Sequence, residues 1–77
     1  SEYAQIIMKI KEIDSEIERY DQALYKLDIL KNANSDKFDE VLHRKVFQTK
    51  IVKKAEKASY EEQGRYLYSL IKESERL

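Results

Sequence analysis

Apolar side chains in the first thirty residues recur at alternating steps of three and four, the spacing of one helix face in a coiled coil. This seam runs for more than three heptads without a proline or a glycine. It predicts a helix over about residues 2–31, roughly 45 Å long at 1.5 Å per residue. The seam consists of Tyr3, Ile6, Ile10, Ile13, Ile17, Tyr20, Leu24 and Leu27.

A polar cluster, NANSD at residues 32–36, follows this helix and predicts a turn. Asn, Ser and Asp side chains bond to nearby backbone groups, which favours turns and caps over helix interiors. We expect Asn34, Ser35 or Asp36 to cap a second helix that begins near residue 37. If the chain folds back near residue 34, residues whose numbers sum to about 68 lie side by side.

The second helix, predicted over about residues 37–62, has two apolar faces. One face contains Phe38, Val41, Leu42, Val52, Ala55 and Ser59. The other is a ridge of Phe47, Ile51, Ala55 and Ala58, roughly 100° further round the helix at 100° per residue. A helix with two apolar faces packs against two neighbours. We expect the first helix to cover one face and a third helix or a second chain to cover the other.

Gly64 is the only glycine in the chain. A glycine in a helix interior costs about 1 kcal/mol relative to alanine. Either Gly64 breaks the helix and a short third helix follows over residues 65–77, or one long helix tolerates it; we favour the break. Both alternatives give an all-α fold, a long antiparallel coiled-coil-like hairpin in a single domain that assembles into a helical bundle.

The chain lacks the residues that several kinds of functional site require. The chain has no cysteine, so disulfides and thiolate chemistry are excluded. The single histidine, His43, has no partners at metal-ligand spacing, and no glycine-rich loop exists to bind phosphate. We therefore expect no metal, no cofactor and no enzymatic activity. No apolar run approaches the ~20 residues of a membrane span, and we expect a cytoplasmic protein.

Charge is divided between the two halves of the chain. Residues 1–40 carry ten acidic and six basic residues, net −4, whereas residues 41–77 carry five acidic and nine basic residues, net +4. The basic half contains a stripe at spacing i, i+3, i+4, i+7, made of Lys50, Lys53, Lys54 and Lys57. We expect this stripe to pair with acids of the first helix, with Asp14 opposite Lys54 and Glu18 opposite Lys50.

These patterns predict a small protein–protein interaction module, such as an adaptor, a chaperone-like protein or a regulatory subunit. It would act by self-association, most simply as a homodimer, or by binding a partner helix. The expected interface residues are Phe47, Ile51, Ala55, Ala58, Tyr66 and Leu70. The alternative is a small helical regulator that grips nucleic acid phosphates with the lysine stripe, but a chain of zero net charge disfavours it.

Overall fold

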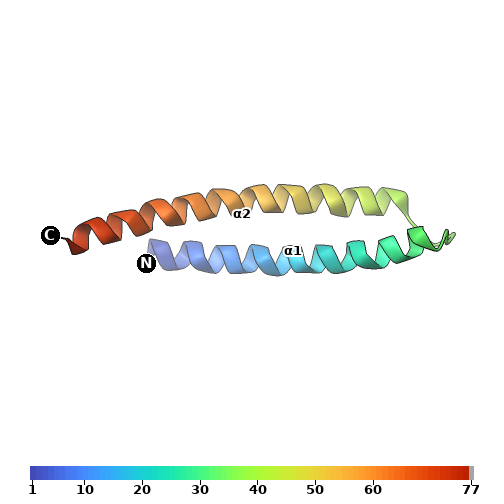
Figure 1. Cartoon of the computed structure of the whole chain (residues 1–77), viewed down its shortest axis with the longest axis horizontal. Coiled ribbons are helices and arrows are strands. Elements are labelled where there is room, and N and C mark those ends of the chain that lie inside the picture. The colour runs from blue at the N-terminus through green and yellow to red at the C-terminus, as the bar shows by residue number, and fades with distance from the viewer. Residues whose placement is uncertain (77) are drawn as a thin grey trace.

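The computed structural model describes residues 1–76 and contains two long helices. Helix α1 spans Glu2–Asn32 and helix α2 spans Glu40–Glu75. The two helices run side by side in opposite directions and form a rod of 65 × 16 × 14 Å (Figure 1). The predicted fold class, an antiparallel helical hairpin, is confirmed.

The end of α1 is closed by backbone hydrogen bonds that the polar cluster makes possible. Asn34 has a φ of 51°, in the left-handed region that asparagine tolerates better than most residues. Its N–H donates to the carbonyl of Lys31, and the N–H of Ser35 donates to the carbonyl of Leu30, each at 3.0 Å. This pair of bonds is a Schellman motif, so Asn34 ends the first helix and does not begin the second.

Helix α2 begins at Glu40, three residues later than the sequence pattern predicts. Its cap is Asp39, whose Oδ1 accepts a hydrogen bond from the N–H of Leu42 at 2.9 Å. The prediction that one of residues 34–36 caps α2 is therefore wrong. The connection needs those residues for the end of α1 and for the turn, where Ser35 Oγ accepts from the backbone N–H two residues on.

Helix α2 continues without a break through Gly64, so no separate third helix begins after it. Leu77, the last residue of the predicted third helix, lies outside the described residues. Gly64 is the only buried residue of α2. A Cβ placed on it would lie 3.5 Å from Cγ2 of Ile6, so α1 packs closely against the glycine. Tyr68 still packs against Tyr3, at 6.1 Å between ring centroids, and the C-terminal end of α2 extends past the N-terminus of α1 (Figure 1).

The interior of the rod is a thin line of α1 side chains. Ile13 is fully buried, Leu24 and Leu27 are 8% exposed, and the other residues of the predicted α1 seam are half-buried. The predicted seam of α1 therefore faces α2. The radius of gyration is 18.0 Å, whereas a compact domain of this length would have about 11.5 Å.

Candidate interaction surface

The face of α2 that packs against α1 is polar in its middle. The half-buried residues that follow heptad steps are His43, Val46, Lys50, Lys53, Lys57, Tyr60 and Leu67, and Glu56 beside them is half-buried as well. Lysine thus occupies positions where a coiled coil normally places apolar residues. The prediction that α1 covers one of the two apolar faces of α2 is wrong, because α1 covers the lysine face on the opposite side of the helix.

The buried face of α2 is predicted wrongly for a geometric reason. The residues of α2 that meet α1 repeat every 3.5 positions, whereas a straight helix repeats every 3.6 positions. The contact line therefore drifts around α2 by about 20° per heptad, roughly 80° over four heptads. A projection at a fixed 100° per residue divides this line between several faces and makes the exposed ridges look more continuous than the true contact.

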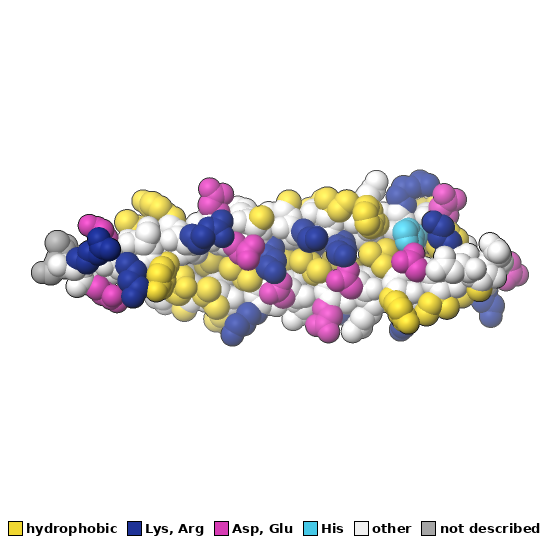
Figure 2. All heavy atoms as spheres, in the orientation of Figure 1, with side chains coloured by type: hydrophobic (Ala, Val, Ile, Leu, Met, Phe, Trp, Pro, Cys, Tyr) yellow, Lys and Arg dark blue, Asp and Glu magenta, His cyan; other side chains and the backbone are white. Residues whose placement is uncertain are grey.

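Carboxylates of α1 meet all three lysines of this polar seam. The pairs are Lys50–Asp21, Lys53–Glu16 at 3.2 Å and Lys57–Asp14 at 2.6 Å between Nζ and the carboxylate oxygen. Figure 2 shows basic and acidic side chains along the line where the two helices meet. The predicted pairing of the basic stripe with α1 is confirmed for these three lysines. The specific pairs predicted are wrong, because the numbers of paired residues sum to 69 or 71 instead of about 68.

Ion pairing raises the pKa of two of these lysines. A hydrogen bond to Glu16 is the largest cause of the raised pKa of Lys53, against partial desolvation, and the charges of Glu16 and Glu56 add to the effect. A hydrogen bond to Asp14 likewise raises the pKa of Lys57. Both ammonium groups therefore stay charged at neutral pH and hold the two helices together along one line.

His43 continues the polar seam at its turn end. Its Nε2 lies 3.0 Å from Oδ1 of Asp28, and its ring centroid lies 5.8 Å from that of Phe38. Among residues 1–76, no group of three or more acidic, histidine or cysteine side chains is arranged to hold a metal ion. His43 therefore serves as the last polar link between the helices.

Lys54 differs from the other three lysines of the predicted stripe. It is exposed, and the described part of the chain provides no carboxylate within ion-pair distance. A nucleic acid phosphate that used the whole stripe would have to displace acids of the same chain from the other three. The geometry therefore disfavours the stripe as a phosphate grip.

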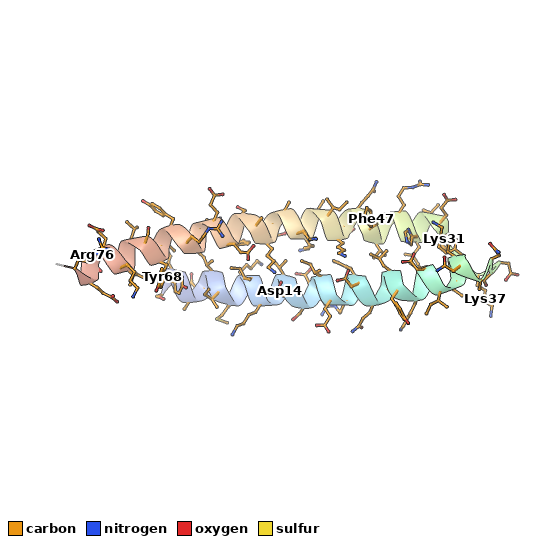
Figure 3. The ribbon with its side chains drawn as sticks, in the orientation of Figure 1. Asp14, Lys31, Lys37, Phe47, Tyr68 and Arg76 are labelled. Atoms are coloured by element: carbon orange, nitrogen blue, oxygen red, sulfur yellow. The ribbon has the colours of Figure 1, made fainter. Side chains whose placement is uncertain are left out.

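The faces of α2 turned away from α1 are rich in apolar side chains. Phe47 and Ile51 are 48% and 52% exposed, and Figure 3 places Phe47 towards the turn end of α2. The residues predicted as an interface are all exposed, namely Phe47, Ile51, Ala55, Ala58, Tyr66 and Leu70. The structure adds Val41, Leu42 and Val52, which the sequence pattern assigned to the face against α1.

The rod exposes more surface than a compact protein of its mass. Its accessible surface is 6265 Å² at a mass of 9.2 kDa. Folded monomers of that mass expose about 4,900 Å² by the usual scaling, roughly 1,300 Å² less. Each partner of a standard protein–protein interface buries about 800 Å². The excess is thus large enough to supply a complete interface.

Within residues 1–76, neither helix has a segment both long and apolar enough to cross a membrane. Compared with known proteins, the chain matches no family model, no curated protein and no solved structure.

Proposed function

We propose that this protein is a small helical interaction module that packs the exposed faces of α2 against another helix. That helix belongs to a second copy of the chain or to a partner protein. The observation that carries the proposal is the exposed ridge of Phe47, Ile51 and Ala58 beside a seam that is itself polar. Monomeric proteins rarely leave contiguous apolar surface in water unless a partner covers it.

Helix α2 uses ion pairs for its contact with α1 and apolar side chains for its contact with a partner. Ion pairs align α2 with α1, so its large apolar side chains are not needed inside the hairpin and stay available to a partner. A module of this kind supports binding and not catalysis, as an adaptor or regulatory subunit does.

The double substitution Phe47→Ser and Ile51→Ser tests the proposal. Burying one such side chain stabilises an interface by about 1.5–3 kcal/mol, and each substitution counts twice in a two-fold dimer. We expect a micromolar dimer to become a monomer in sedimentation equilibrium. Helix content by circular dichroism should stay the same, because both residues lie outside the seam that contacts α1.

The exposed residue Gln48 provides a matched control, since Gln48→Ser should leave both measurements unchanged. Loss of helix content in step with dissociation would place the ridge inside the hairpin and contradict the proposal. If the wild-type chain stays monomeric near millimolar concentration, the ridge must bind a different protein. A pull-down with the wild-type chain and the double variant would then have to recover a protein that only the wild type retains.

A further inference from the structure

One flank of α2 carries a second heptad stripe that is complementary to its own reversed copy. The stripe follows steps of four and three beside the polar seam, and all of its members are exposed. They are Glu40, Arg44, Phe47, Ile51, Lys54, Ala58, Glu61 and Arg65. We refer to these eight residues as the self-complementary stripe. At 1.5 Å per residue it is about 38 Å long.

The stripe has one acidic and one basic residue at each end. When the second copy runs in the opposite direction, each of these residues faces one of opposite charge. A two-fold axis between residues 52 and 53 brings together residues whose numbers sum to 105. In that arrangement Glu40 faces Arg65 of the other copy, and Arg44 faces Glu61. Each pair occurs twice because the symmetry is two-fold, so the contact contains four ion pairs.

The central side chains also fit by size when the second copy runs in the opposite direction. Phe47 faces the small Ala58 of the other copy, and Ile51 faces the aliphatic stem of Lys54, whose ammonium group can reach solvent. A large side chain opposite a small one lets two helices approach to the 8–10 Å that helix packing requires. Apart from the two Lys54 ammonium groups at solvent, the middle of the stripe is apolar and its ends are charged, which resembles the apolar core and polar rim of protein interfaces.

We propose that the partner of this stripe is a second copy of the chain, packed α2 against α2 in antiparallel orientation. The proposal rests on the interaction function above and specifies its partner. The stripe lies about 100° round α2 from the line that faces α1, by heptad geometry. A second copy can therefore bind it while the hairpin stays intact.

Other registers of the same stripe fit less well. A shift by one heptad places Arg44 opposite Lys54 in one direction, and Ile51 opposite Glu61 in the other. The first meeting brings together like charges, and the second places a carboxylate on an apolar side chain. Only the register centred between residues 52 and 53 satisfies both charge and size.

Other surfaces of the hairpin lack this complementarity. On the opposite flank of α2, an antiparallel arrangement that pairs Lys45 with Glu56 places the apolar Leu42 and Val52 opposite Ser59 and Thr49. The flank of α1 beside the stripe carries the carboxylates of Asp14, Glu18 and Asp21, which would meet their own copies. The contact is therefore centred on the two α2 helices.

Charge reversal provides the test, with Arg44→Glu and Glu61→Arg made separately and together. Each single variant places like charges together at two symmetric positions of a homodimer. Given exposed ion pairs of up to about 1 kcal/mol, we expect each single variant to dimerise roughly 10–30-fold more weakly than the wild type. An equimolar mixture of the two single variants should form a mixed dimer, and the double variant should recover its homodimer.

The design controls for changes within the helix. Arg44 pairs with Glu40 four residues earlier, at 3.8 Å, so Arg44→Glu also removes that contact. The double variant does not restore this pair, so recovered dimerisation must come from the contact between chains. Sedimentation equilibrium measures affinity, and native mass spectrometry with one mass-labelled variant measures mixed dimers.

The outcomes separate this proposal from the function on which it rests. A dimer that depends on Phe47 and Ile51 but shows no rescue in the mixture or the double variant overturns the register and leaves the interaction module standing. A wild-type chain that is monomeric near millimolar concentration overturns self-association and leaves binding to a partner protein. A dimer unaffected by every one of these substitutions overturns both.

Discussion

Lys50, Lys53 and Lys57 occupy the inner positions of α2, where leucine or isoleucine would give the hairpin more apolar burial. Their side chains are 25–31% exposed, so the ammonium groups meet the α1 carboxylates at the rim of the contact. Ion pairs open to solvent stabilise a fold only modestly. Their clearer effect is to select a face, because no other face of α2 would match the acids of α1. Polar residues at such positions are best known for selecting register and partner.

The raised pKa values of Lys53 and Lys57 predict a loss of stability in alkali. A lysine whose pKa rises on folding, from 10.5, stabilises the folded state fully below that value. This contribution disappears as the pH rises through the higher folded pKa. We therefore expect the midpoint of thermal unfolding to fall above about pH 10.5, measured by circular dichroism between pH 9 and pH 12.

The matched control is the double substitution Lys53→Arg and Lys57→Arg. Arginine keeps its charge throughout this range, and every other side chain is the same in both proteins. The arginine variant should therefore lose less stability than the wild type between pH 10 and pH 12. Equal losses would mean that the two lysines do not link the helices.

The two helices differ in how far their sequences predict them. Helix α1 has one continuous apolar seam, so its extent and its buried face are predicted correctly. Helix α2 has apolar side chains on several faces. A prediction from apolar side chains alone therefore selects the wrong face for the contact with α1. The acids of α1 indicate the right face, but only once the register is known. The sequence predicts that the ridge around Phe47 and Ile51 lies outside the contact with α1, covered by a third helix or a second chain, because one helix cannot cover both faces.

The continuity of α2 through Gly64 follows from packing and not from helix propensity. A glycine penalty of about 1 kcal/mol favours a break, but the hydrophobic residues on either side and the close approach of Ile6 favour one helix. A local penalty of this size is small beside the contacts of a whole helix turn with α1. The sequence could not reveal this, because the contact joins residues 58 positions apart.

Replacement of Gly64 by alanine should stabilise the hairpin. The added Cβ would lie 3.5 Å from Ile6 Cγ2, an ordinary van der Waals distance. The gain in helix propensity should therefore appear as up to about 1 kcal/mol in the free energy of unfolding, measured with urea. Gly64→Leu, by contrast, should destabilise because its larger side chain meets Ile6. A destabilised alanine variant would show that the two helices pack too tightly at this position to admit a Cβ.

The whole molecule is a rod, and the proposed dimer should hardly lengthen it. The C-terminal end of α2 lies 22.5 residues from the proposed two-fold axis, about 34 Å at 1.5 Å per residue. Two copies therefore span about 68 Å, close to the 65 Å of a single hairpin. We expect X-ray scattering to show a maximum dimension near 70 Å while the mass doubles. End-to-end association would instead give about 130 Å, and dilution of the sample distinguishes the species.

The seam also determines how freely one helix could slide along the other. Both sets of charges repeat every seven residues, as Asp14, Asp21 and Asp28 on α1 and as His43, Lys50 and Lys57 on α2. Sliding α2 by one heptad, about 10.5 Å, would still place Lys50 beside Asp14 and His43 beside Asp21. The pair at Lys53 does not repeat in this way, because the same slide would place Lys53 beside Lys9 instead of Glu16. This pair and the folded connection at residues 33–39, with its own hydrogen bonds, therefore select the same alignment. Even with a flexible insertion of seven residues at the connection, the pair of Lys53 with Glu16 would favour the present alignment.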